Sequence, residues 1–364
     1  MNIADLADLN PWWTDPSEIK NIKEIRSWKE TKSKIEYIPR VIHRFKLDED
    51  MIYTLRGPRQ VGKTTLLFIL IYRLLERGIE PRRIFYWTMD LVKDRTELQK
   101  ILMTYISWLR NQTERRAYIF LDEITSVSKW QNTIKFLVDT NKLRDFFVLV
   151  TASHTMDIAR GAERLPGRQG TADPLPNKVL LPMKFIEHIE LRNDKIKSWI
   201  LDTNFKALET RKEIFNDLIK GKPNKTLEEL QLYGKKIDDL FIDYTITGGV
   251  IKAIDTYLGE GIIPITVFND YKEFILGDFL KAGMNEDYLI QILTQLLETH
   301  TTPIGWETLK KQTTIGSRDT VSKYVNHLQY SYIVSIIKSL KHEKNTPDYQ
   351  KNKKVYFSDP FIFH

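Results

Sequence analysis

Residues 57–65 constrain the fold of this chain more than any other segment, because they contain the phosphate-binding pattern G-x-x-x-x-G-K-T. The β-prone run Met51–Arg56 precedes them, and the apolar, helix-like run Leu66–Leu75 follows them. Glycines let backbone N–H groups turn inward around phosphate oxygens, and the following helix adds the positive end of its dipole. A strand, this loop and a helix in that order predict a site for a nucleoside triphosphate.

The side chains of this loop suit phosphate and metal binding. Lys63 can reach the β- and γ-phosphates, and the Thr64 hydroxyl can ligate Mg²⁺. A guanine-specific site usually has N-K-x-D after a strand, whereas Asn141–Arg144 lacks the Asp and precedes a strand. This favours ATP over GTP. We expect ATP to contact the whole loop, namely Gly57, Pro58, Arg59, Gln60, Val61, Gly62, Lys63, Thr64 and Thr65.

Two acids follow a later apolar run, Ala117–Leu121. Acids at the carboxyl end of a buried parallel strand point into the ligand crevice. We therefore expect Asp122 to hold Mg²⁺, and Glu123 to orient and deprotonate the water that attacks the γ-phosphate. An acidic strand end facing solvent is the alternative, and the phosphate loop upstream makes the catalytic interpretation the better one.

The next apolar run, Phe146–Val150, is followed by Thr151, Ala152 and Ser153. A hydroxyl at this strand end can hold the attacking water or contact the γ-phosphate, and Ser153 is the preferred candidate over Thr151. The alternative that Ser153 caps a following helix stays open.

The loop beyond this strand is rich in Gly, Pro and Arg, and contains Arg160, Arg164 and Arg168. An arginine can stabilise the charge of the transferred phosphoryl group, either in cis or from a neighbouring subunit of a homo-oligomer. Arg168, within Pro-Gly-Arg, is our candidate, although most loop arginines have no such role.

Alternating strand and helix candidates predict an α/β fold with a parallel sheet. The strand candidates are Met51–Arg56, Arg83–Met89, Ala117–Leu121, Phe146–Thr151 and Lys178–Leu181. Trp12 and Trp13, beside Pro11, are expected to pack the N-terminal segment onto this core. The expected divisions are the N-terminal segment, the P-loop core, a helical domain and a winged-helix domain, at residues 1–50, 51–184, 185–285 and 286–364.

The last division has the layout of a winged helix-turn-helix, in which three helices precede a two-stranded hairpin. The helix candidates are Asp287–Thr299, Ile304–Lys311 and Arg318–Gln329, and the β-prone runs are Tyr332–Ile337 and Lys354–Phe357.

The excess positive charge of the chain lies in this division. Residues 310–354 hold ten Lys and Arg against three acids, which equals the net charge of +7 of all 364 residues. A localised positive surface attracts polyanions through counterion release. We expect DNA contacts from the start of the presumed recognition helix, namely from Ser317, Arg318, Thr320, Ser322 and Lys323. A winged helix that contacts protein or closes over the core is the alternative.

Composition excludes other classes. The chain is 42% hydrophobic and 28% charged, and no apolar run approaches the roughly 20 residues of a membrane span. It has no cysteine, so disulfides and thiolate metal sites are excluded. The N-terminus lacks the pattern of a signal peptide. We expect a cytoplasmic protein without a membrane anchor.

Several motifs together resemble the AAA-related P-loop ATPases that are abundant in archaea and are also found in bacteria. They cover nearly the whole chain, and are most specific between residues 10 and 190. They are NPWW (Asn10–Trp13), LRGPRQVGKTTLL (Leu55–Leu67), FLDEI (Phe120–Ile124), SKWQNTIKFLVD (Ser128–Asp139), VTAS (Val150–Ser153), LPGRQG (Leu165–Gly170) and LPMKFIEHI (Leu181–Ile189), with looser matches at TGGV (Thr247–Val250) and VYFSDPF (Val355–Phe361).

The resemblance implies an ATPase core with additional strands and a catalytic glutamate, a helical region and a C-terminal winged helix. It implies the roles given above for Lys63, Thr64 and the acidic pair, and makes Ser153 the sensor of the fourth strand. Ala152 departs from the usual glycine before that serine, which puts the freedom of the sensor loop in doubt. Some members continue into a small nuclease-like domain, so a truncated chain and a short member both stay open.

The sequence therefore predicts a Mg²⁺-dependent ATPase whose basic winged helix binds DNA. The alternative from another class is a nucleotide-dependent switch that acts on a protein partner, with the C-terminal domain as a lid. A ring-shaped motor with an arginine supplied by the next subunit is a further alternative.

Overall fold

The computed structural model describes residues 2–31, 35–111, 116–153, 165, 167–341 and 343–364. Contacts divide the chain into two compact units. Unit 1 comprises Met1–Leu181 and Asp270–Tyr356, and unit 2 comprises Pro182–Asn269 and Phe357–His364. None of the helices in these described ranges is long and apolar enough to cross a bilayer.

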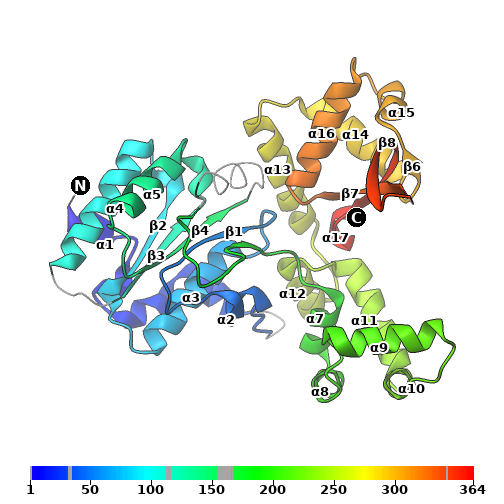
Figure 1. Cartoon of the computed structure of the whole chain (residues 1–364), viewed down its shortest axis with the longest axis horizontal. Helices are drawn as coiled ribbons and strands as arrows, with labels where there is room; N and C mark the ends of the chain where they lie inside the picture. Colours follow the sequence, from blue (N-terminus) through cyan, green and yellow to red (C-terminus); the bar gives the residue numbers. More distant parts are fainter. Residues whose placement is uncertain (1, 32–34, 112–115, 154–164, 166, 342) are drawn as a thin grey trace. The chain divides into compact units, whose positions relative to one another are not determined.

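A parallel sheet lies among the helices of the N-terminal part of unit 1 (Figure 1). Its elements are β1 Ile52–Arg56, α3 Lys63–Glu76, β2 Ile84–Thr88, α4 Arg95–Arg110, β3 Ala117–Asp122, α5 Trp130–Asp139, β4 Phe146–Ala152 and β5 Asn177–Val179. The strand order in the described residues is β2-β3-β4-β1-β5, with every neighbouring pair parallel. Because βαβ crossovers are right-handed, α3 covers one face while α4 and α5 cover the other. The predicted α/β sheet is confirmed.

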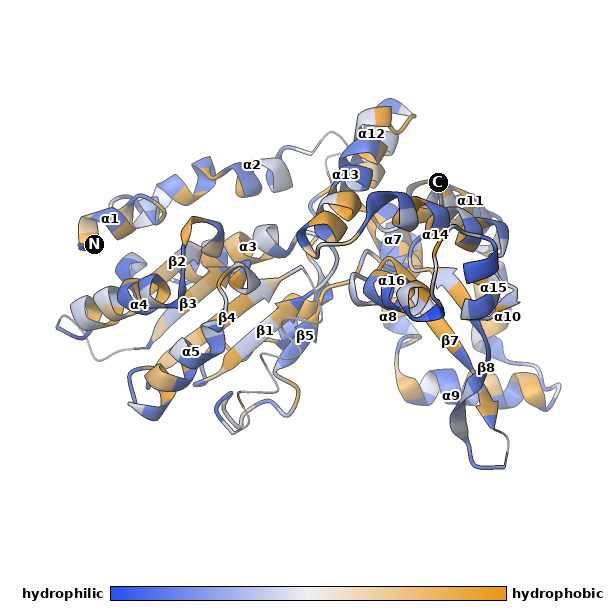
Figure 2. Cartoon of the chain, turned by 90° about the horizontal axis from the view of Figure 1, so that it is seen from above, coloured by the Kyte–Doolittle hydropathy of each residue, from blue (hydrophilic) through white to orange (hydrophobic). Residues whose placement is uncertain are grey.

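The inner strands are apolar because both faces of the sheet are covered. Every residue of β3 and β4 is buried. The hydropathy colouring shows these strands as hydrophobic, between helices with mixed surfaces (Figure 2). Asp122 is therefore the first charged residue that the chain reaches along β3, at the carboxyl edge of the sheet.

The N-terminal segment lies along β2. Trp12 and Trp13 belong to the hydrophobic core, as predicted, and both indole N–H groups donate to the carbonyl oxygen of Ile84, at 3.0 and 2.8 Å. Asn10 accepts from the N–H of Tyr86 at 2.7 Å and donates to its carbonyl at 3.1 Å. These bonds satisfy an edge strand that would otherwise be free to pair with another chain. The segment comprises α1 Ile3–Ala7, η1 Pro11–Trp13, η2 Pro16–Asn21, α2 Lys23–Lys29 and η3 Arg40–Arg44.

The strand at the opposite edge, β5, is anchored by a buried ionic contact. Lys178 Nζ lies 2.5 Å from Asp173 Oδ2, and the Tyr53 hydroxyl donates to the same oxygen at 3.1 Å. Gly170 has a φ of +87°, and a Cβ there would lie 2.3 Å from the carbonyl oxygen of Asp50. The loop that leads to β5 therefore depends on glycine at this position.

The C-terminal part of unit 1 carries helices and a second, small sheet. The elements are α13 Ile265–Lys281, in which the unit boundary falls, α14 Glu286–Glu298, β6 Pro303–Ile304, α15 Trp306–Lys311, α16 Arg318–Tyr330, β7 Val334–Lys341 and β8 Thr346–Phe357. In the described residues the sheet order is β6-β8-β7, and β6 is antiparallel to β8. The sequence did not predict β6, and it placed the start of β8 too late, at Lys354. Most of β8 is exposed and its exposed residues are polar or charged, so it lacks the apolar alternation that marks a strand.

Unit 2 is helical. Its elements are α7 Phe185–Arg192, α8 Asp194–Asp202, α9 Leu208–Ile219, α10 Lys225–Gln231, α11 Gly234–Thr247, α12 Ile251–Glu260 and α17 Pro360–Phe363. Within Phe185–Ile219 the chain forms three helices and not one continuous helix. Asn193 ends α7 and caps α8, since its side chain accepts from the N–H of Ile196 at 3.0 Å. The α12 helix was not predicted.

Two motifs of the family resemblance meet inside unit 2. The Asp359 carboxylate accepts from the N–H of Gly249 at 2.8 Å and from that of Phe361 at 3.0 Å. A Cβ on Gly248 would lie 1.8 Å from Asp359 Oδ1, and one on Gly249 would lie 2.2 Å from the carbonyl oxygen of Met183. The two glycines are therefore needed to close unit 2 around the C-terminal segment.

Candidate functional site

The phosphate loop lies at the carboxyl end of β1. A Cβ on Gly57 would lie 2.1 Å from the carbonyl oxygen of Leu180, so the loop starts at a contact that only glycine permits. Gln60 and Gly62 have φ values of +57° and +93°, which turn the backbone before α3 begins at Lys63. The loop and the first turn of α3 together offer inward N–H groups to an anion.

Lys63 folds back across this loop. Its Nζ donates to the carbonyl oxygens of Gly57 at 3.1 Å and Pro58 at 2.8 Å, and the side chain is buried. Burial lowers the pKa of Lys63 to about 8, against the opposing effect of Glu123 and Asp122. Phosphate oxygens can replace the two carbonyls as acceptors and would stabilise the charged amine.

Asp122 receives two hydroxyl groups from different elements. The Thr64 hydroxyl donates to Oδ2 at 2.7 Å, and the Thr151 hydroxyl donates to Oδ1. Burial raises the pKa of Asp122, and these two hydrogen bonds oppose that rise. A hydroxyl and a carboxylate oxygen side by side form the donor set that Mg²⁺ prefers in P-loop sites. Thr64 and Asp122 thus lie together, as the sequence analysis required of a metal site.

Glu123 is held in an unusual backbone conformation. Its φ of +50° lies in the left-handed region, which costs a non-glycine residue about 1 kcal/mol. Its N–H donates to the Thr151 hydroxyl at 3.0 Å, and its Oε1 accepts from the Ser153 hydroxyl at 2.5 Å. Two hydroxyls, one in β4 and one directly after it, therefore fix the backbone and the carboxylate of the same residue. The capping alternative for Ser153 concerns residues outside the described ranges.

Thr151 has a role that the sequence analysis did not assign. Its side chain is fully buried and bridges Asp122 and Glu123. The sequence feature that could have indicated this role is a hydroxyl at the end of an otherwise apolar strand. Tyr86 of β2 also reaches Asp122, at 3.5 Å between its hydroxyl and Oδ2, and this contact was missed as well.

Arg168 does not reach the phosphate loop of its own chain. Its Nε lies 2.6 Å and its Nη2 3.2 Å from the two carboxylate oxygens of Asp139, at the end of α5. Because α5 runs back from the carboxyl edge of the sheet, its end lies at the opposite edge. Arg160 and Arg164, the other loop arginines considered, lie outside the described residues.

Arg59 is the loop residue whose side chain leaves the site. Its Nε lies 2.5 Å from Oδ1 of Asp278 on α13, within unit 1. The phosphate-loop pattern predicted that Arg59 contacts ATP, and nothing in that pattern indicated Asp278.

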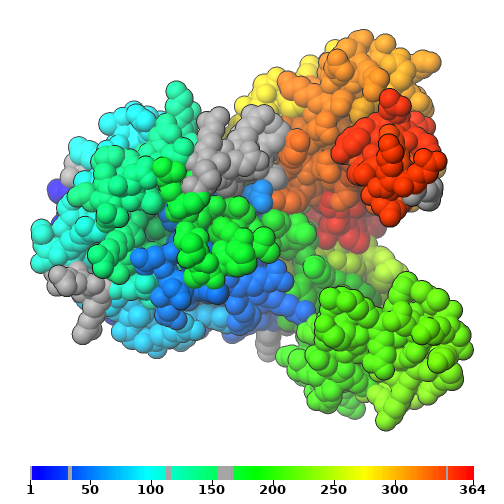
Figure 3. All heavy atoms as spheres, viewed as in Figure 1, coloured from blue at the N-terminus to red at the C-terminus, as the bar shows by residue number. Residues whose placement is uncertain are grey.

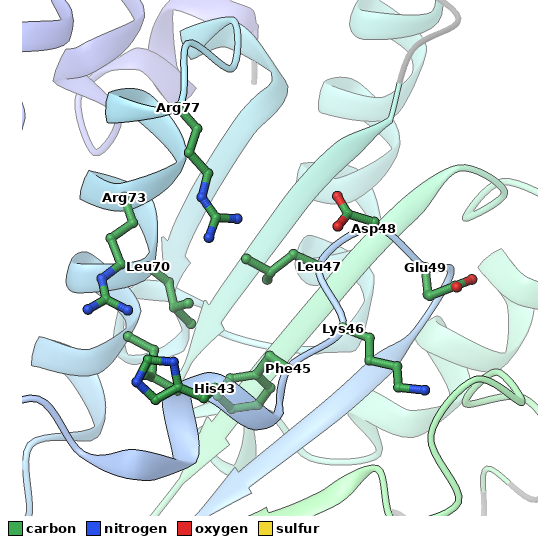
Figure 4. Close-up of a pocket in the computed structure, with 10 residues that line it drawn as sticks. His43, Phe45, Lys46, Leu47, Asp48, Glu49, Leu70, Arg73 and Arg77 are labelled. Atoms are coloured by element: carbon green, nitrogen blue, oxygen red, sulfur yellow. The ribbon is translucent and has the colours of Figure 1, made fainter.

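A cavity of about 520 Å³ lies elsewhere, against the last turns of α3 (Figure 4). Leu70 and Arg73 contribute from α3 and Arg77 from the position directly after it, and His43 and Phe45–Glu49 contribute from the segment before β1. Since β1 and α3 run in opposite directions, this cavity is at the amino edge of the sheet. It is therefore separate from the phosphate loop.

The predicted DNA-contacting residues lie at the start of α16. Ser317 caps the helix, since its hydroxyl accepts from the N–H of Thr320 at 3.0 Å. Arg318 and Lys323 are exposed, whereas Thr320 and Ser322 are half-buried.

The sheet is parallel, the phosphate loop follows β1, and β4 lies between β3 and β1. This is the arrangement of a P-loop domain. Residues 49–189 match the family model of the AAA domain, and residues 238–364 match a model described as a domain of unknown function. Residues 49–189 thus match an AAA domain, in agreement with the resemblance to the AAA-related P-loop ATPases.

Individual relatives are distant. The uncharacterized protein MJ1637 of Methanocaldococcus jannaschii is 31% identical over 166 residues, which are 45% of this chain and 32% of that protein. The chain thus spans about a third of that relative. The Walker-type ATPase PABY2304 of Pyrococcus abyssi superposes with a TM-score of 0.50 at 14% identity, over 94% of this chain and 96% of that one. Orc1 of Aeropyrum pernix, whose structure was solved in complex with DNA, gives a TM-score of 0.35 at 13% identity, over 97% of this chain and 94% of that one. This structural similarity is too low to support a conclusion about this chain.

Proposed function

We propose that this protein is a Mg²⁺-dependent ATPase whose basic C-terminal region binds DNA. The observation that carries the hydrolytic part is the hydroxyl network that joins Thr64, Asp122, Thr151, Glu123 and Ser153 at the end of the phosphate loop. A structural acid at a strand end would not need hydroxyl partners from both the loop and the neighbouring strand.

Each residue has a defined task in this reaction. Lys63 balances the charge of the β- and γ-phosphates, and the backbone of Gly57–Thr65 orients them. Thr64 and Asp122 would hold Mg²⁺, which supplies further positive charge to the same phosphates. Glu123 accepts a proton from water as the water attacks the γ-phosphorus, and Ser153 fixes the carboxylate that does so.

The test is steady-state ATP turnover by the full chain. Glu123→Gln removes the proton acceptor, and should lower kcat about 10³-fold while leaving ATP binding intact. Lys63→Ala should abolish binding and turnover together. Glu76→Gln and Lys100→Ala, at exposed positions on α3 and α4, are matched controls and should behave like wild type. Turnover that does not exceed the Lys63→Ala background, with or without DNA, sinks the proposal.

We propose residues 286–364 as a winged-helix domain, with α16 as its recognition helix. Support comes from the order of α14, α15, α16, β7 and β8, and from a cluster of positive charge. The pKa of Lys353 is lowered by burial and then by repulsion from Arg318 and Lys338. The three cations come from α16, β7 and β8, and this convergence suits a phosphate backbone.

Aromatic side chains accompany the basic cluster. Lys353 Nζ lies 5.4 Å from the centre of the Trp306 ring, and Lys338 Nζ lies 4.4 Å from that of Tyr349. Tyr349 is 65% exposed, and β7 and β8 stand at the surface of the molecule (Figure 3). Cation–π contacts hold the lysine amines near the surface without neutralising them.

DNA binding is tested by its salt dependence. Arg318→Glu with Lys323→Glu should weaken duplex binding and reduce the slope of log K against log salt by about 2. Lys197→Glu with Lys212→Glu, at exposed positions of unit 2, changes the net charge equally and should leave the slope unchanged. Equal losses in both pairs would show that net charge, and not α16, determines binding.

A second candidate function is a nucleotide-dependent switch on a protein partner. One observation favours it: the helical domain proposed at residues 185–285 exposes large apolar side chains. Phe215 is 62%, Ile219 68% and Leu232 84% exposed. Such surfaces commonly mark protein contacts. ATP turnover without any salt-dependent DNA binding would favour this function.

Cytoplasmic location and assembly into a homo-oligomer belong to the same proposal. An oligomer would allow Arg168 to act in trans after leaving Asp139. Molecular mass measured by light scattering, with and without ATP, tests the assembly.

A further inference from the structure

The phosphate loop is joined to a helix more than two hundred residues later in the chain. Arg59, the third residue of the loop, places its Nε 2.5 Å from Oδ1 of Asp278 on α13, a separation of 219 residues in sequence. The side chains are 31% and 14% exposed respectively, so water screens this ion pair only in part. Both residues belong to unit 1.

The helix that carries Asp278 also packs on the proposed recognition helix. Phe279, the next residue, has its ring centre 4.4 Å from that of His327 and 6.0 Å from that of Tyr324, both on α16. A short chain of contacts therefore runs from the phosphate loop through Asp278 and Phe279 to α16.

This junction is not fully packed. A small cavity of about 10 Å³ lies between Arg59, Asp278, Phe279 and Ser331. Ser331 is buried, and its hydroxyl has no hydrogen-bond partner among the described residues. An unsatisfied buried hydroxyl costs free energy as long as Arg59 is paired with Asp278. This cost favours a junction that can open.

We propose that Asp278 is a positioning residue that couples the ATP site to α16, because its carboxylate competes with the nucleotide phosphates for Arg59. The inference rests on the proposed function. A phosphate is at least as good a partner for a guanidinium as a carboxylate is, and both cannot occupy the same N–H groups. When Arg59 turns to the phosphates, α13 loses its tie to the loop and α16 is released with it.

The Asp278 carboxylate weakens nucleotide binding in two ways. It withholds Arg59 from the nucleotide, and its own negative charge opposes a triphosphate nearby. Asp278→Asn should therefore bind nucleotide more tightly, although it removes an ion pair from the folded protein. Because coupling is reciprocal, nucleotide should also change DNA affinity in wild type, and this change should shrink in Asp278→Asn.

The experiment measures the Kd of a non-hydrolysable ATP analogue by fluorescence titration of the full chain. Asp278→Asn should lower Kd about fivefold or more, the lower end of typical coupling between sites. Arg59→Gln should raise Kd, and Asp278→Asn should lower Kd by a smaller factor in the Arg59→Gln background than in wild type. Asp278→Glu keeps the carboxylate and should remain near wild type, and Glu273→Gln, exposed on the same helix, is the matched control.

The result that overturns the coupling is an unchanged or raised Kd in Asp278→Asn, or an equal gain with and without Arg59. Thermal melting of each variant confirms folding. If Asp278→Asn does not fold, Asp278→Glu is measured in its place. A Kd of Asp278→Glu as high as that of Arg59→Gln would then contradict the proposed competition for Arg59. If wild type binds no nucleotide better than Lys63→Ala, the proposed function itself fails. If only the coupling proposal is wrong, wild type still binds nucleotide better than Lys63→Ala does.

Discussion

The two candidate sites of unit 1 are built in opposite ways. The acidic pair at the end of β3 is held by hydroxyl hydrogen bonds; Asp122 is only 5% exposed and Glu123 is half-buried. On the basic surface of α16, β7 and β8, Arg318 and Lys338 are exposed and Lys353 is half-buried, and Lys353 is close enough to both of them to be repelled. The buried site orients two carboxylates, which suits chemistry, whereas the exposed site accumulates charge, which suits a flexible polyanion. Substitutions should therefore change rate sharply in the first site and salt dependence gradually in the second.

Thr151→Val should have the largest effect among these tests. Valine keeps the volume but removes the bridge between Asp122 and Glu123, so both acids lose their fixed positions. We expect kcat to fall about 10²-fold, as for a 1 Å misplacement of a reacting group, with little change in ATP affinity. Steady-state and equilibrium binding measurements separate the two quantities.

The control is Thr54→Val in β1. Thr54 is equally buried, and its hydroxyl donates to Asn177 at 2.7 Å, away from the acids. It should lose stability but keep kcat, and Thr151→Ser should restore most of the activity. If both valine variants lower kcat alike, Thr151 contributes only to folding and the contrast between the two sites disappears.

The pH dependence of nucleotide binding should be the next largest effect. Burial lowers the pKa of Lys63 to about 8, and a triphosphate binds the charged amine. Below pH 8 Lys63 is already protonated, so this residue adds no pH dependence. Above pH 8 binding requires uptake of a proton, and Kd should rise about tenfold per pH unit.

Calorimetry in two buffers of different ionisation enthalpy measures this proton uptake directly. Lys63→Arg keeps its charge at every pH tested, and should show no rise in Kd above pH 8. A flat wild-type profile between pH 7 and 9.5 would mean that burial does not control the charge of this lysine.

The same contrast explains how far the sequence could predict the molecule. Gly57–Thr65 and the acidic pair are contiguous patterns, and a buried parallel strand dictates their surroundings, so these elements were predictable. The bridging role of Thr151 could be predicted only from the register of β3 beside β4, in which Leu121 lies opposite Val150. The Arg59–Asp278 pair needed tertiary packing across 219 residues, which no local pattern encodes. In β8, exposed charged residues hid the strand, because no buried face imposed alternation.

Lys353→Gln should have the smallest effect, and it tests whether the exposed site has any organisation. If Lys353, Arg318 and Lys338 contact neighbouring phosphates as a cluster, one lost cation should reduce the salt slope by about 0.9 and weaken DNA binding accordingly. Lys310→Gln is the matched control from the same basic region, since Lys310 already lies 3.5 Å from Glu307 and should contribute less. Fluorescence anisotropy at several salt concentrations gives both slopes. Equal slopes for the two variants would mean that the surface acts through its total charge, whereas a larger change in Lys353→Gln would show that the fold directs these cations toward one strand of phosphates.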